Sequence, residues 1–281
     1  MPIQISPIIS ARTRGDGSFS VKTIDLDALG ERASPVVLLD DFRVRGQPFG
    51  PHPHAGFSAV TYVLEDSQGS LRSRDSLGND NVVGPGGIVW TEAASGVMHE
   101  EVPAESGREL HGLQIFVNLS AKNKLIPPKV LRLFGDEVPE WQDEAGGRVR
   151  VVVGSFKGVQ SPILPAEPVD LLDIYLRQEV TFDLASGHNA LAYVLEGEVV
   201  VRAGDREAKL SASQAVAISG GGGVTLRASG NSHLVLLSGA EIREPIFARG
   251  PFIMNDRKQV EEANARYHAG AMGHLAPLAK H

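Results

Sequence analysis

The sequence predicts an all-β protein made of two similar β-barrels in tandem, with a short helix near the C-terminus. Two observations carry this prediction: short β-rich runs along the whole chain, and an internal repeat that relates the two halves. The composition agrees, because 31 glycines and 17 prolines in 281 residues are typical of many short strands joined by turns. Long helices would contain fewer of both.

The β-rich runs are short, and each is bounded by Gly, Pro, Asn, Asp or Ser. They cover residues 60–64, 87–90, 113–117, 151–153, 191–201 and 234–237. Runs of this length that are rich in Val, Ile and aromatic residues, with turn residues at their ends, predict strands.

The repeat is a four-letter match between the halves. Tyr62-Val63-Leu64-Glu65 recurs as Tyr193-Val194-Leu195-Glu196, at an offset of 131 residues (193 − 62). The same letters in a comparable place within two β-rich halves indicate that a small barrel was duplicated.

The division between the halves is expected near residue 134, because the polar stretch 135–147 resembles a connector. We therefore predict an N-terminal barrel over residues 1–134 and a C-terminal barrel, together with the terminal helix, over residues 135–281. The helix is expected to start at Asp256, which is a suitable N-cap before the run that ends at Tyr267.

Charge and cysteine content exclude several classes of function. The net charge is −7, whereas nucleic-acid binding requires a basic surface, so we expect no direct nucleic-acid partner. The chain has no cysteine, which excludes disulfides, thiolate metal sites and a cysteine nucleophile.

No window is apolar over the length of a membrane span, and the first fifteen residues lack the unbroken apolar stretch of a signal peptide. We expect a cytoplasmic protein with no membrane association.

Two pairs of metal-ligating residues stand out in the N-terminal half. His52 and His54 are two residues apart, with Pro51 before the pair and Pro53 inside it. His99 and Glu101 repeat that spacing. Proline favours extended backbone, and alternate residues of a strand project to one face. Two such strands in one barrel would place three imidazoles and one carboxylate around a common point, a donor set that suits a first-row transition metal. Glu100, between two of these residues, is expected to face the other way.

The second half lacks these residue types. When it is aligned on the repeat, Asp183 and Ala185 fall opposite His52 and His54. The segment 220–225, which contains no ligand residue, falls opposite the second pair. We expect the C-terminal barrel to be free of metal.

The motifs around these residues resemble those of a known family. Gly46, five further residues and then His52-x-His54 match the first cupin motif, and Gly96-x-x-His99 resembles the core of the second. Longer segments make the chain similar to the pirins: HPHAGFSAVTYVLE (52–65), RDSLGN (74–79), GPGGIVWTEAASGVMHEEVP (84–103), GLQIFVNLS (112–120) and REPIFARGPFIMN (243–255). They occur in both halves, so the resemblance covers most of the chain. It departs from the family at Ser58, where an acidic residue is common, and at Ala94-Ser95, where Gly-Arg or Gly-Lys is common.

The resemblance implies a fold of two cupin-type (jelly-roll) barrels. It also implies one divalent transition metal in the N-terminal barrel, with Fe(2+) as the expected ion and Mn, Ni, Cu and Zn as alternatives. The implied ligands are His52, His54, His99 and Glu101. Several bacterial pirins are quercetin 2,3-dioxygenases, which implies an oxidoreductase acting on a flavonol and O2.

Two functions are compatible with these residues. In the enzyme, Glu101 could also act catalytically by accepting the proton of the substrate hydroxyl. Phe57 and Met98 flank the predicted ligands and are candidate cavity walls. The alternative is a non-enzymatic regulator that responds to metal or redox state and binds a protein partner. An open apolar cavity above the metal would favour the enzyme.

Overall fold

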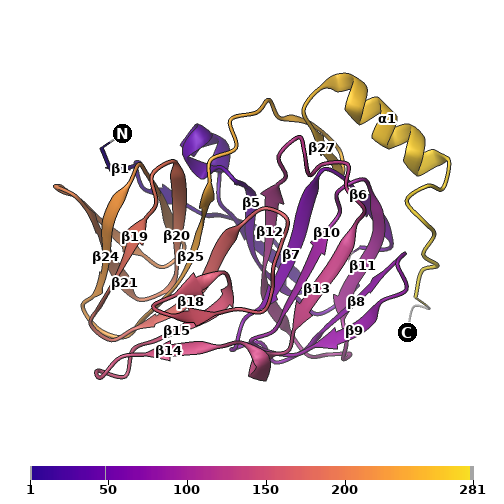
Figure 1. Ribbon diagram of the computed structural model, residues 1–281. Coiled ribbons are helices and arrows are strands. Elements are labelled where there is room, and N and C mark those ends of the chain that lie inside the picture. The colour runs from indigo at the N-terminus through magenta and orange to yellow at the C-terminus, as the bar shows by residue number, and fades with distance from the viewer. Residues whose placement is uncertain (1, 48, 279–281) are drawn as a thin grey trace. The chain divides into compact units, whose positions relative to one another are not determined.

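The computed structural model describes residues 2–47 and 49–278 and consists mainly of β-strands (Figure 1). The chain forms two compact units, each assembled from three separate segments. The N-barrel unit contains residues 13–21, 38–137 and 242–281, and the C-barrel unit contains residues 1–12, 22–37 and 138–241, insofar as these are described. No described helix is long and apolar enough to cross a membrane.

The N-barrel unit is built from two antiparallel sheets. The larger has the order β13-β10-β7-β12-β5-β4-β3. These strands are β3 (Arg12–Gly15), β4 (Phe19–Thr23), β5 (Val36–Val44), β7 (Phe57–Val63), β10 (Ile88–Glu92), β12 (Leu110–Asn118) and β13 (Lys129–Leu133). The smaller has the order β6-β11-β8-β9, made of β6 (His52–His54), β8 (Leu71–Asp75), β9 (Asp80–Val83) and β11 (Val97–Pro103).

The C-barrel unit repeats this plan. Its larger sheet has the order β1-β23-β20-β25-β18-β15-β14, with β2 also on β23, and its smaller sheet has the order β19-β24-β21-β22. The larger contains β1 (Gln4–Ile5), β2 (Ile9–Ser10), β14 (Glu140–Gln142), β15 (Arg148–Val153), β18 (Val169–Leu176), β20 (His188–Glu196), β23 (Gln214–Ser219) and β25 (Ser232–Ala240). The smaller contains β19 (Glu179–Leu184), β21 (Glu198–Ala203), β22 (Arg206–Ser211) and β24 (Gly222–Ala228). A hairpin of β16 (Ser155–Phe156) and β17 (Val159–Gln160) precedes β18.

The two units match strand for strand, as the repeat predicts. Strands β5, β6, β7, β8, β10, β11 and β12 have the same neighbours as β18, β19, β20, β21, β23, β24 and β25. Tyr62 on β7 and Tyr193 on β20 occupy equivalent places and are both fully buried. The prediction of two cupin-type barrels is therefore confirmed.

Each barrel has its own apolar core. In the C-barrel unit, alternate residues of the strands, among them Val149, Leu172, Val201 and Leu236, form one large buried cluster. In the N-barrel unit, Val44, Val63, Leu71, Val83, Val89 and Leu110 form a smaller cluster.

One predicted run, 191–201, is divided into β20 and β21 by Gly197, whose φ of +79° favours glycine.

The terminal helix forms where the sequence predicts it. Helix α1 (Arg257–His268) begins after Asp256, whose carboxylate accepts a hydrogen bond from the Gln259 backbone N–H at 2.8 Å. Two short 3-10 segments, η1 (Leu26–Ala33) and η2 (Gly135–Glu137), are the other helical elements of the described chain.

The predicted domain division differs from the structure at both ends of the chain. The C-terminal segment, with β26 (Phe247–Arg249), β27 (Phe252–Met254) and α1, belongs to the N-barrel unit and not to the C-terminal barrel. The reason is apolar burial: Phe252, Met254 and Val260 pack with Ala55 and Met98 in one cluster. Figure 1 shows α1 beside β27. The first segment of the chain likewise pairs with β23 and so belongs to the C-barrel unit.

Candidate metal centre

The three predicted histidines converge on one point. His52 and His54 lie on the short strand β6, which pairs with β11 so that His52 is opposite His99. The Nε2 atoms of His52 and His99 are 3.1 Å apart, and one ring nitrogen from each of the three residues lies within 4.8 Å of the others. An ion held at about 2.1 Å by two nitrogens at right angles leaves those nitrogens about 3 Å apart. The spacing of the imidazoles therefore fits a first-row transition ion.

Burial lowers the pKa of His54 and of His99, which keeps these two imidazoles neutral. Burial, followed by the charge of His52, lowers the pKa of His54 to about 3. Burial and the charges of His54 and His52 also hold the pKa of His99 well below its ordinary value. A neutral imidazole has the lone pair that binds a metal. The His52 Nδ1 lies 2.9 Å from the Gly50 carbonyl, and donation to that oxygen leaves its Nε2 free as a ligand.

The chemistry of the donors also fits a bound ion. The Nε2 atoms of His52 and His99 approach to 3.1 Å, and neutral imidazole nitrogens placed this close offer their lone pairs to one common point. The donor set and its surroundings are therefore consistent with a resident metal.

Glu101 lies beside this group but outside it. Its carboxylate accepts hydrogen bonds from Thr61 Oγ1 at 2.5 Å and from Ser73 Oγ at 3.3 Å. Burial raises the pKa of Glu101 to about 7, although both hydrogen bonds act in the opposite direction. Glu100 faces the other side of β11, as predicted, and pairs with Arg74.

A cavity of about 220 Å³ opens above His52, His99 and Glu101, between the two sheets of the N-barrel unit. Most of its wall is apolar, formed by Phe19, Val21, Phe42, Val44, Phe49, Leu71, Pro103 and Leu110. Three polar residues complete it, namely Asp40, Thr61 and Gln114. These three were missed by the sequence analysis. The available signal was a polar residue on the otherwise apolar, cavity-facing side of a strand, such as Asp40 before Phe42 and Val44.

The other residues singled out beside the ligands lie elsewhere. Phe57 contacts His54, with 5.0 Å between ring centroids, but does not line the cavity. Met98 packs with Phe252 and Met254 in the core below the C-terminal segment. Ser58 is fully buried and, by strand alternation, faces away from Thr61 and the cavity.

Comparisons with known proteins agree with this geometry. The family model described as Pirin matches residues 18–117, and the model described as Pirin C-terminal cupin domain matches residues 171–273. A Pseudomonas aeruginosa protein named "Putative quercetin 2,3-dioxygenase PA3240" is 34% identical over 86% of this chain and 88% of its own length. A tomato protein named "Pirin-like protein" is 31% identical over 94% of this chain and 90% of its own. The chain belongs to the pirin family.

Among solved structures, this pirin is similar to a crystal structure of quercetin 2,3-dioxygenase from Acinetobacter baumannii. The TM-score is 0.86 at 28% identity, covering 98% of this chain and all of the other. The similarity therefore extends through both barrels and the C-terminal segment.

The second barrel of this pirin has apolar residues at the positions equivalent to the ligands. Phe182 is opposite Val224 across β19 and β24, as His52 is opposite His99 across β6 and β11. In the same way, Leu226 takes the place of Glu101, since it pairs with β21 as Glu101 pairs with β8. Leu184 then takes the place of His54, two residues after Phe182.

The predicted alignment, which placed Asp183 and Ala185 at these positions, was wrong by one residue. Two residues separate β6 from β7, but three separate β19 from β20. A one-residue slip along a strand moves every side chain to the other face. Asp183 is accordingly exposed, whereas Leu184, Val224 and Leu226 are buried in the core of the C-barrel unit.

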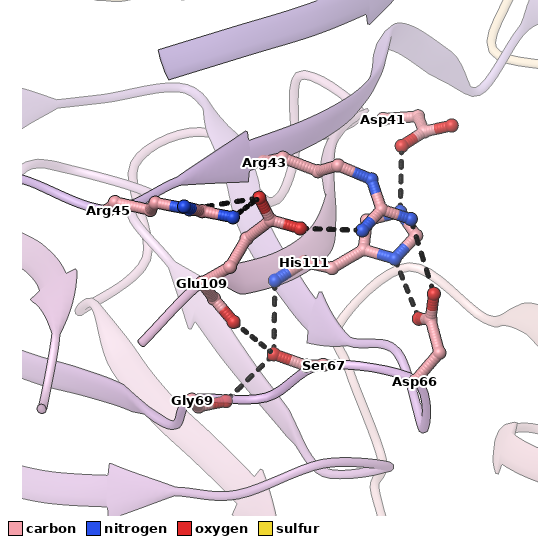
Figure 2. A network of polar contacts seen from close by, with 8 residues as sticks. All are labelled: Asp41, Arg43, Arg45, Asp66, Ser67, Gly69, Glu109 and His111. Atoms are coloured by element: carbon pink, nitrogen blue, oxygen red, sulfur yellow. Dashed lines mark hydrogen bonds and ion pairs between the residues drawn. The ribbon is translucent and has the colours of Figure 1, made fainter. Parts of the chain in front are cut away.

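A polar network lies on the faces of β5 and β12 that point away from the cavity. Figure 2 shows His111 of β12 between two carboxylates, with Nδ1 2.6 Å from Asp66 and Nε2 3.0 Å from Asp41 of β5. Arg43 adds ion pairs to Asp66 and Glu109. Neighbouring residues of both strands, such as Asp40 and Leu110, face the cavity instead. The network thus fixes two of the strands that form the cavity wall.

This network is expected to make the free energy of unfolding depend on pH. Burial lowers the pKa of His111, but its hydrogen bonds to Asp41 and Asp66 and their charges outweigh burial and raise it. Stability from His111 is complete below the unfolded pKa of about 6.5 and is lost as pH rises through the higher folded value. The pKa of Asp66 is lowered to about 2, chiefly by its hydrogen bond to His111, so its contribution is lost only in strong acid.

His111→Gln is therefore expected to lower the free energy of unfolding by about 1–2 kcal/mol near pH 6, and by less at pH 8. Urea unfolding of both proteins from pH 5 to pH 9 measures this difference. His274→Gln, at an exposed position, is the control. A difference that grows with rising pH would contradict a protonated His111.

Proposed function

We propose that this chain is a metal-dependent dioxygenase that cleaves quercetin or a related flavonol with O2. The observation that supports it best is that His52 and His99, two members of the three-histidine group, line an apolar cavity. The names of the relatives PA3240 and the Acinetobacter enzyme point to the same reaction. Apolar pockets with a few convergent polar groups are typical of small-molecule sites.

The proposed metal is iron(II), held by His52, His54, His99 and Glu101. A nitrogen-rich set with one carboxylate suits iron, and also manganese, nickel, copper or zinc. When bound, the metal would supply Lewis acidity for the flavonol 3-hydroxyl and redox chemistry toward O2. The carboxylate of Glu101 would have to move from its contacts with Thr61 and Ser73 to reach the ion.

The residues of the chain would orient and deprotonate the substrate. Phe19, Phe42 and Phe49 provide flat apolar walls for the flavonol rings. Glu101, whose pKa burial raises to about 7, is suited to accept the proton of the 3-hydroxyl near neutral pH. Both atoms of O2 would enter the product as the central ring opens, with loss of carbon monoxide.

The test is oxygen uptake matched to the loss of the flavonol absorbance band, with protein reconstituted anaerobically with iron(II). We expect the two rates to agree, to require metal, and to vanish with a flavone that lacks the 3-hydroxyl. Equal rates for reconstituted and metal-stripped protein would show autoxidation of the flavonol. The function as a metal- or redox-responsive regulator with a protein partner would then be favoured.

A further inference from the structure

The C-barrel unit contains a second and larger cavity, of about 640 Å³. It extends along the edge strand β19 and is lined by residues of β19, β24 and β21 and of the hairpin β16–β17. It has no part in the metal centre, whose residues all belong to the N-barrel unit.

The charge of this cavity favours an anion. Lys157 and Arg202 both line it, against a single carboxylate, Asp183. Neither cation forms an ion pair within the described part of the chain, although Glu207 is opposite Arg202 on the next strand. The hydroxyl groups of Thr181 and Thr225 lie in the same wall and can donate further hydrogen bonds.

Lys157 is an unexpected residue at its position. It forms, with Gly158, the two-residue loop between β16 and β17, and both have positive φ, +44° and +84°. Such type I′ turns favour Asn, Asp or Gly, and a lysine there is strained because its Cβ crowds the following carbonyl oxygen. Strained residues of this kind are concentrated at binding sites.

The side chain of Lys157 is also held in place. Its Nζ lies 4.1 Å from the centre of the Trp141 ring and 5.4 Å from that of Phe156. Contacts between a cation and aromatic faces fix the ammonium group beside the cavity. A ligand anion that approaches Lys157 would therefore also come close to the indole of Trp141.

Part of the wall is apolar. Phe156, Phe182 and Val224 line the cavity beside the two cations. The volume exceeds what a bare inorganic anion requires, and carboxylate binds well to arginine and lysine. We propose that the C-barrel unit binds a small aromatic carboxylate, with its charge on Lys157 and Arg202 and its ring against Phe156 and Phe182.

Calorimetric titration of the 281-residue, metal-free chain with benzoate tests the proposal. We expect one benzoate per chain, and at least tenfold weaker binding of benzamide, which lacks the charge, and of inorganic phosphate, which lacks the ring. Trp141 fluorescence should change with the same affinity, because Trp90, the other tryptophan, is buried in the N-barrel unit. No binding, or equal binding of benzoate and benzamide or of benzoate and phosphate, would overturn the proposal.

Three variants locate the site. Lys157→Asn should weaken benzoate binding at least tenfold and leave the melting temperature unchanged or higher, since asparagine suits the turn. Lys209→Asn, which removes an exposed lysine paired with Glu198, should bind as the wild type does. Asp183→Asn should bind more tightly, because a repulsive charge is removed. Unchanged affinity in a folded Lys157→Asn protein would refute the assignment.

Discussion

Replacing Glu101 with glutamine is expected to reduce flavonol turnover by about 10²–10⁴-fold, the usual cost of losing a general base. The amide keeps the shape of the side chain and an oxygen that can still coordinate weakly, but it cannot accept the substrate proton. Its oxygen can also keep the hydrogen bond from Thr61 Oγ1. We therefore expect most of the metal to remain bound.

The measurement is flavonol decay with matched oxygen uptake, together with metal content, for the wild type and Glu101→Gln. Glu100→Gln is a matched control, because Glu100 is the adjacent residue and faces Arg74 on the other side of β11. Wild-type turnover in a metal-loaded Glu101→Gln protein would rule out the proton-acceptor role. Loss of metal from that variant would instead make Glu101 primarily a ligand.

The sequence alone was sufficient to predict the two barrels and the convergence of the three histidines. Strand periodicity is a local property, and it places His52, His54 and His99 on extended segments without any knowledge of the fold. The repeat of Tyr62 at Tyr193 indicated the duplication, since both residues occupy buried positions on equivalent strands.

Two features depended on tertiary structure and could not be predicted from the sequence. The C-terminal segment joins the N-barrel unit because Phe252 and Met254 find a complementary apolar surface around Ala55. A pattern within residues 242–278 cannot indicate that partner. Likewise, Asp40 and Gln114 line the cavity because β5 and β12 are neighbours in the sheet, although 74 residues (114 − 40) separate them in the chain.

The alignment of the second barrel failed for a local reason. One extra residue between β19 and β20 reverses which residues face inward, and the four-letter repeat lies after that loop. The inward positions hold phenylalanine, leucine and valine, so the C-barrel core is filled where the N-barrel has its histidines. We therefore expect one metal per chain.

His99→Ala is expected to reduce the metal content from one ion per chain to nearly none after dialysis. His99 lies opposite His52, with their Nε2 atoms 3.1 Å apart, so its loss leaves two imidazoles and a carboxylate that is held by Thr61 and Ser73. Metal binding to the folded state alone raises the free energy of unfolding by about 2.7 kcal/mol at a hundredfold excess over the Kd. The wild type should therefore melt at a higher temperature when iron(II) is added, and His99→Ala should not.

His188→Ala is the control, since His188 lies on β20 in the C-barrel unit and should leave both metal content and the thermal shift unchanged. Elemental analysis of anaerobically reconstituted proteins gives the stoichiometry directly, and thermal unfolding with and without metal gives the linked stability. Two ions per wild-type chain would place a metal in the second barrel, against its apolar interior. Full metal retention in folded His99→Ala would show that the three-histidine group is not the site.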